Sequence, residues 1–260
     1  MNVALVDSFR SEWLKKKNSL GVWLVLCGSL FTPAIVMVAR LVQHDRLLPI
    51  YAAGDFWRSL WRNSWESMAI FFLPLCAILA TSLLTQIEYR KTAWKQVHTL
   101  PLSLATVVVS KLAVMFVMLG QFFVLFNVGV GLSGTLHWAM VAGVPFPADP
   151  LPLIDFLRQD ALYVIDCLPI VALQYALALR YANFLVSVGF GFLLWVALAA
   201  LSWKYGYLIP YTYVMVDYLK QVPGSKAAHV DADIHISALG YFLVFIAIGY
   251  AMFATRRQKG

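Results

Sequence analysis

Six stretches of this chain are long and apolar enough to cross a lipid bilayer as helices. A spanning helix needs about 20 predominantly apolar residues. Charged residues make up only 13% of the chain, about half the share that a soluble domain carries. We therefore predict an all-α, polytopic membrane protein, with residues 1–260 forming a single transmembrane domain. The six predicted spans are Leu20–Val42, Met68–Ile87, Ala105–Leu132, Ala161–Leu179, Phe184–Trp203 and Ala238–Thr255.

Basic residues gather on one side of the predicted membrane. Cytoplasmic loops are enriched in Lys and Arg. If both ends of the chain lie inside, that side carries twelve basic residues and three acids, and the other side carries eight and nine. We therefore expect both termini in the cytoplasm and residues 204–237 as an extracytoplasmic segment. The net charge of +7 follows from this topology, which argues against nucleic acid as a partner.

Residues 1–19 combine apolar and basic side chains at helical spacing. They predict an amphipathic cytoplasmic helix that rests on membrane lipids, with basic side chains toward anionic headgroups. This helix is a plain anchor, a mechanical elbow, or both. The apolar run that follows exceeds a signal peptide in length and has no convincing cleavage site, so we expect it to be retained. The expected interface anchors of this region are Trp13, Lys15, Lys16 and Lys17.

The first external segment places Trp57, Trp61 and Trp65 four residues apart, on one face of a predicted helix. Aromatic rings settle at headgroup depth, so an aromatic belt at the outer interface is favoured over an external gate or a substrate-contacting helix. Residues 133–160 contain four prolines and are expected to be mostly extended or turn-like. The sequence leaves open whether this segment re-enters the membrane.

Four polar side chains fall inside predicted spans. Gln121 and Asn127 lie in the third span, and Asp166 and Gln174 lie in the fourth. Polar groups in the membrane are costly and usually face the bundle interior or a wet cavity. They line a substrate path or form hydrogen bonds between helices, and the sequence does not choose between these roles.

Signatures of an enzyme or a metal protein are weak or missing. His229, Asp231, Asp233 and His235 alternate along the chain, but a solvated loop is favoured over a metal site, and we expect no metal. No nucleotide-binding G-x-x-x-x-G-K-[ST] loop and no H-E-x-x-H or G-x-S-x-G motif occurs, so none of these catalytic sites is predicted. We expect no cofactor in this chain.

A short basic segment, Glu88–Ser103, separates the second and third predicted spans. Glu88, Lys91 and Lys95 fall on one face of a helix, and Pro101 would end that helix. Lys111 follows within the next span, where a long basic side chain is expected to reach the cytoplasmic headgroups. A helix of this kind is suited to contact a partner from the water side.

This segment resembles the first cytoplasmic loop of ABC transporter type-2 permeases. The resemblance is carried by Glu88, by the helix from Arg90 to Val97, by Leu100-Pro101-Leu102-Ser103 and by Ser110-Lys111. Lys91-Thr92 stands where such families often have Gly-Thr. Six spans, the basic N-terminus and the chain length also match, so the resemblance covers the whole chain. It is most similar to the small permeases of lantibiotic-immunity and antimicrobial-peptide exporters.

The resemblance implies that residues 88–104 form a coupling loop that binds a cytoplasmic ABC ATPase subunit. ATP and Mg would be held by that partner, and a second permease subunit, identical or homologous, would complete the path. The implied location is a bacterial plasma (inner) membrane. The coupling residues would be Glu88, Arg90, Lys91, Trp94, Lys95 and Pro101.

Three functions follow. The first is a permease of an exporter that moves an amphipathic peptide or lipid-like substrate outward. The second is a permease-like subunit that transduces ATP energy for immunity, sensing or envelope machinery without solute transport. The third is a structural or enzymatic membrane protein with no ATPase partner.

Overall fold

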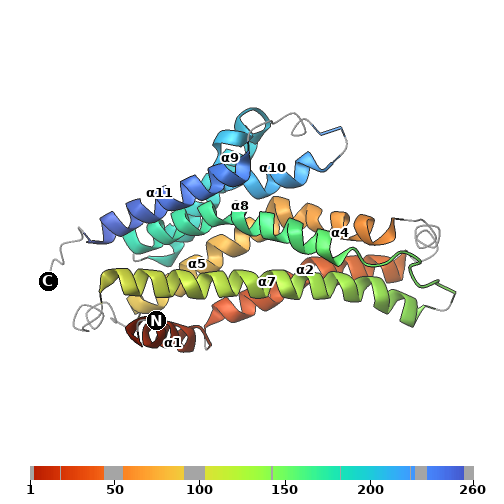
Figure 1. The fold of residues 1–260 in the computed structure, drawn as a ribbon, viewed down its shortest axis with the longest axis horizontal. Coiled ribbons are helices and arrows are strands. Elements are labelled where there is room, and N and C mark those ends of the chain that lie inside the picture. The colour runs from red at the N-terminus through yellow and green to blue at the C-terminus, as the bar shows by residue number, and fades with distance from the viewer. Residues whose placement is uncertain are drawn as a thin grey trace.

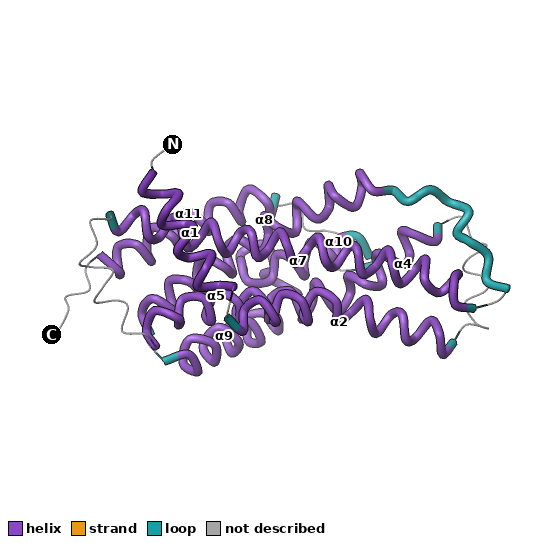
Figure 2. The backbone as a smooth tube through the Cα atoms, turned by 90° about the horizontal axis from the view of Figure 1, so that it is seen from below, coloured by secondary structure: helices purple, strands orange, loops and turns teal. Residues whose placement is uncertain are grey.

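The computed structural model describes residues 3–17, 19–43, 55–90, 103–141, 143–181, 183–222, 224–225 and 233–254, and within these ranges every regular element is a helix (Figures 1 and 2). The all-α prediction is confirmed. The α-helices are α1 (Val3–Lys17), α2 (Leu20–Val42), α4 (Phe56–Ser67), α5 (Leu73–Arg90), α7 (Leu104–Met140), α8 (Leu153–Arg180), α9 (Phe184–Tyr205), α10 (Tyr213–Lys220) and α11 (Ile234–Ala254).

Six helices of the described chain are long and apolar enough to cross a membrane, as predicted. Several of them extend beyond the apolar runs. The second span begins at Phe56 rather than Met68, because one π-helical turn, Met68–Phe72, joins α4 to α5 in a continuous helix. The third continues to Met140. A search for apolar runs misses such extensions, because a helix with one polar face has a low mean hydropathy.

Two sets of helix ends lie at opposite ends of the bundle (Figure 1). Helix α1, the end of α5, the start of α7 and the end of α11 lie at one end of the bundle. The end of α2, the start of α4, the end of α7 and the start of α8 lie at the other. The segment between α5 and α7 therefore joins two helices at the end that also holds the first and last helices of the chain.

The tryptophans expected at the outer membrane interface pack inside the protein instead. The helical spacing is as predicted, but Trp57, Trp61 and Trp65 are all buried. The Trp65 ring centroid lies 4.3 Å from that of Tyr163 on α8 and 4.8 Å from that of Phe126 on α7. The parts of α7 and α8 that extend beyond their apolar runs also cover α4: Phe156 stacks on Trp61 at 5.1 Å between ring centroids, and Gly134 lies against the Trp57 ring. The three tryptophans expected in an aromatic belt are thus part of the core where α4, α7 and α8 meet.

Residues 133–160 are largely helical, contrary to the expectation from their prolines. Helix α7 continues through Met140, and α8 begins at Leu153. Only the stretch between these helices lacks helical structure among its described residues. The prolines all fall in this connection, where proline's missing amide donor interrupts no helix.

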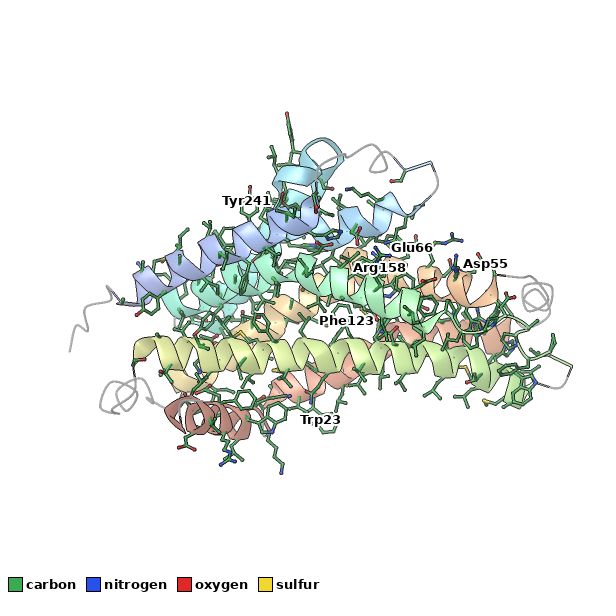
Figure 3. The ribbon with its side chains drawn as sticks, in the orientation of Figure 1. Trp23, Asp55, Glu66, Phe123, Arg158 and Tyr241 are labelled. Atoms are coloured by element: carbon green, nitrogen blue, oxygen red, sulfur yellow. The ribbon has the colours of Figure 1, made fainter. Side chains whose placement is uncertain are left out.

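Three helices carry broad apolar faces that the fold leaves open. Most side chains of α2, α9 and α11 remain uncovered by the rest of the chain. Figure 3 shows one of them, Trp23, at the outer side of α2, whereas Phe123 lies in the interior. Apolar faces of this kind suit contact with lipid or with another membrane subunit.

Candidate functional site

The predicted coupling loop is framed by two well-defined helix ends. Helix α5 ends at Arg90, so Glu88 and Arg90 lie in its last turn. Helix α7 begins at Leu104, and the Ser103 hydroxyl caps it by accepting a hydrogen bond from the Thr106 amide at 3.1 Å. Such a cap satisfies an amide that the helix start leaves without a partner. Lys91, Trp94, Lys95 and Pro101 lie outside the described residues, so the short coupling helix stays a prediction.

A buried ion pair joins the N-terminal helix to the helix that follows this loop. The Lys111 ammonium on α7 lies 2.6 Å from a carboxylate oxygen of Glu12 on α1, and both side chains are buried. Lys15 contacts the other Glu12 oxygen at 2.5 Å. Burial alone would raise the pKa of Glu12, but the charges of Lys111 and Lys15 outweigh it and lower that pKa. Lys111 therefore turns inward to Glu12 rather than outward to the headgroups.

A second contact between the same two helices involves Lys16. Its ammonium donates a hydrogen bond to the side-chain carbonyl of Gln121 at 2.5 Å and lies 4.0 Å from the centre of the Trp13 ring. Gln121, one of the four polar residues predicted inside the membrane, thus contacts α1. Together the two contacts hold α1 along the first half of α7.

Gln174 lies at the centre of a buried network that links α5, α8 and α9. Its amide donates to the Ser82 hydroxyl at 2.7 Å and to the Ser187 carbonyl at 2.9 Å. The Tyr211 hydroxyl donates to the Gln174 carbonyl oxygen at 3.3 Å. Helix α9 approaches closely at Gly191, where a Cβ would lie only 2.2 Å from that same oxygen. In this structure Gln174 makes helix-to-helix hydrogen bonds, which is one of its two predicted roles.

Asp166 lies in a cluster that the sequence did not bring together. An oxygen of the Asp166 carboxyl group is hydrogen-bonded to the Nδ1 atom of the His235 ring at 2.8 Å. Asp217 from α10 lies beside both residues. One ligand atom from each residue lies within 4.8 Å of the others, which is compatible with a divalent cation such as Zn²⁺. Asp217 was missed because it comes from a separate short helix, so no sequence spacing relates it to Asp166.

The two described residues of the alternating His and Asp pattern, Asp233 and His235, have different partners. A carboxylate oxygen of Asp233 accepts hydrogen bonds from the His235 and Ile236 amides at the start of α11, while the His235 ring turns to Asp166. His229 and Asp231 lie outside the described residues. The remaining polar residue of the third span, Asn127, donates to Asp160 on α8 at 2.6 Å, and so also joins two helices.

A family model described as ABC-2 family transporter protein matches residues 8–198. The match covers four of the six membrane helices completely and most of the fifth, and it includes the Glu12–Lys111 and Lys16–Gln121 contacts. No curated protein matches this chain.

Proposed function

Because this chain belongs to the ABC-2 family of transporter proteins and is a transmembrane subunit of an ABC transporter, we propose that it serves an exporter. The exporter would move an amphipathic peptide or lipid-like substrate outward across a bacterial inner membrane. Membership of this family argues against a structural or enzymatic protein without an ATPase partner.

The observation that carries the coupling mechanism is the position of the segment between α5 and α7. Both helix ends meet it at the same end of the bundle, and α1 is held to α7 there by Glu12 and Lys111 (Figure 1). A cytoplasmic ATPase that pushed on this segment would move the second span, the third span and α1 together. ATP and Mg would be held by that ATPase, and residues 88–104 would form its docking element.

The open apolar faces support assembly with a second permease subunit, identical or homologous. One chain offers six spans, and α2, α9 and α11 are the helices least covered by their own chain. Two such subunits would enclose a path between them. The domain would then be a half-transporter with both termini in the cytoplasm and residues 204–237 outside.

An amphipathic substrate agrees with how the internal polar groups are used. Gln121, Asn127 and Gln174 are each bonded to a neighbouring helix. A path for ions or small polar solutes needs polar groups that are open to the solute. A substrate with a large apolar part can instead follow the boundary between protein and lipid. The likeness to small antimicrobial-peptide exporters belongs to this proposal as well.

The test uses the permease together with the cytoplasmic ATPase that co-purifies with it in mild detergent. We expect Glu88→Gln, or Trp94→Ala combined with Lys95→Ala, to lower substrate-stimulated ATP hydrolysis about tenfold, within the range typical of coupling between sites. Membrane insertion and assembly should be unchanged. Arg58→Gln is the matched control, because the exposed Arg58–Asp155 pair lies in the outer helices α4 and α8.

Normal stimulated hydrolysis in the variants at the coupling loop would overturn the coupling assignment. A second outcome is that the loop variants change the rate of ATP hydrolysis, but no added peptide or lipid changes the rate in the wild-type complex. That outcome would favour the alternative in which the subunit transports no solute. That subunit would transduce ATP energy mechanically.

A further inference from the structure

A groove runs along the outside of the bundle where α1, α2 and α7 meet. Its volume is about 840 Å³, within the range of about 300–1,000 Å³ that ligand sites usually have. Its walls are apolar side chains from α2 and α7, including Val25, Leu26 and Val124. Trp13, Lys16 and Lys17 of α1 form one end of it. The groove is therefore basic at one end and apolar along its length.

The helical spacing of α7 produces this apolar wall. Val117, Gly120, Val124 and Leu125 lie on the groove, and residues three, four and seven apart share one face of a helix. Gly120 leaves the wall open, since no atom lies within 4 Å of the position that its Cβ would occupy. The open space lies within the membrane-spanning part of α7, where lipid chains are the surrounding solvent.

The basic end has no acid of its own. None of the residues that line the groove is acidic, and Glu12, the nearest acid along α1, is engaged by Lys111 and Lys15. Burial lowers the pKa of Lys16, because removal from water disfavours the charged form of an ammonium group. The Gln121 carbonyl that it contacts is a dipole and carries no net charge.

We propose that this groove binds one anionic phospholipid of the inner leaflet, with its phosphate between Lys16 and Lys17 and an acyl chain along α2 and α7. Charge complementarity selects the headgroup, and the apolar wall selects a molecule with a hydrocarbon chain over free phosphate. The bound lipid fixes α1 against α7 beside the Glu12–Lys111 pair. It is a resident ligand, distinct from the exported substrate, so the inference does not depend on the direction or cargo of transport.

The experiment is native mass spectrometry of the full-length chain in detergent, titrated with phosphatidylglycerol or with phosphatidylcholine of the same acyl chains. We expect tighter retention of phosphatidylglycerol. Lys17→Gln, at an exposed position, should weaken that retention about fivefold and leave phosphatidylcholine unchanged, because one basic side chain contributes about 1 kcal/mol at an anionic surface. Lys16→Gln should act in the same direction.

Filling the groove tests the apolar half of the site. Gly120→Leu should lower retention of both lipids about tenfold, since the added side chain enters open space and occupies the wall. Gly131→Leu is the matched control: it lies on the same helix, also has no atom within 4 Å of its Cβ position, and does not line the groove. It should retain both lipids like the wild type.

Equal retention of the two lipids by the wild type would overturn the proposal, as would a Gly120→Leu protein that binds lipid normally. A Gly120→Leu protein that loses a dimer while keeping its lipid would show that a second copy occupies the groove. These outcomes are independent of ATP hydrolysis, so they separate failure of the lipid site from failure of the proposed exporter function.

Discussion

The Lys111 ammonium on α7 lies 2.6 Å from the Glu12 carboxylate on α1, and both side chains are buried. The pair joins the N-terminal helix to the span that directly follows the predicted coupling loop. An interface helix with an apolar face would rest on lipid by itself. This ion pair fixes α1 to one particular helix, and in the proposed coupling mechanism α1 would move together with α7.

Breaking this pair from one side should destabilise the protein more than removing both charges. Glu12→Gln leaves Lys111 buried without its carboxylate, a change that costs about 3–5 kcal/mol for buried pairs. Combining it with Lys111→Met should restore part of the loss. Thermal unfolding of the wild type, the two single variants Glu12→Gln and Lys111→Met, and the double variant in one detergent measures the coupling energy between the two residues. Arg58→Gln breaks an exposed pair and should cost less than about 1 kcal/mol. If the double variant lost as much stability as the two single variants added together, Glu12 and Lys111 would not be coupled.

The same pair predicts a specific acid sensitivity. Neighbouring lysines lower the pKa of Glu12 in the folded protein below its ordinary 4.5. The unfolded chain therefore takes up the proton first as the pH falls, and acid favours unfolding. The wild type should be more stable than Glu12→Gln, and this difference in stability should be constant above about pH 4.5 and become smaller below it. Melting temperatures measured from pH 7 downward check this. A difference that is the same at all pH values would show that the Glu12 charge contributes nothing.

A methyl group at Gly191 should disturb the Gln174 network. The added Cβ would lie 2.2 Å from the Gln174 carbonyl oxygen, and that side chain is held by Ser82 and Ser187. We expect Gly191→Ala to cost about 1–3 kcal/mol, the usual loss when a buried polar group is left without its partner. Gly189→Ala, on the same helix with nothing within 4 Å, should be neutral in the same unfolding assay. If both variants unfold alike, α9 does not depend on this close approach.

Asp217 should respond to pH in the opposite direction from Glu12. Burial, followed by the nearby Asp166 charge, raises the pKa of Asp217 from 3.8 to about 6, although His235, Lys220 and Gln159 oppose the rise. The folded protein then holds this proton more tightly than the unfolded chain, so stability falls as the pH rises through this interval. The loss is on the order of 3 kcal/mol, because each unit between the two pKa values is worth about 1.4 kcal/mol.

Asp217→Asn removes this titration, so its stability relative to wild type should increase between about pH 4 and 6. Unfolding curves of the two proteins across this interval test the prediction. Parallel curves would show that Asp217 ionises as readily in the folded protein as in the unfolded chain. Lys220→Gln removes one opposing charge and should widen the interval toward higher pH.

Local pattern was enough to place the membrane helices. The apolar run that begins at Phe184 matches α9 closely. Even Pro169 and Asp166, which interrupt the fourth run, leave α8 continuous. A membrane helix must satisfy its backbone internally, so about 20 apolar residues in a row specify both the helix and its approximate limits. The continuity of α4 with the second span and the extension of α7 to Met140 were missed because the neighbours that cover them are distant in sequence.

The partners of polar and aromatic side chains were not predictable in this way. The sequence placed Trp65 in a helix and Lys111 near the start of a span, and both placements agree with the structure. It could not show that Tyr163 covers Trp65 or that Glu12 turns Lys111 inward. No pattern in the sequence predicted that Asp217 lies beside Asp166 and His235, because those two residues lie on two other helices.

The sequence by itself determined that this chain is an all-α membrane protein with six helices long and apolar enough to cross a bilayer, because bilayer thickness acts on each segment separately. Only the tertiary structure decided which side chains meet. The pairs Glu12–Lys111 and Asp166–His235 join residues far apart in the chain. Packing between helices selects one set of such contacts from many that the sequence permits.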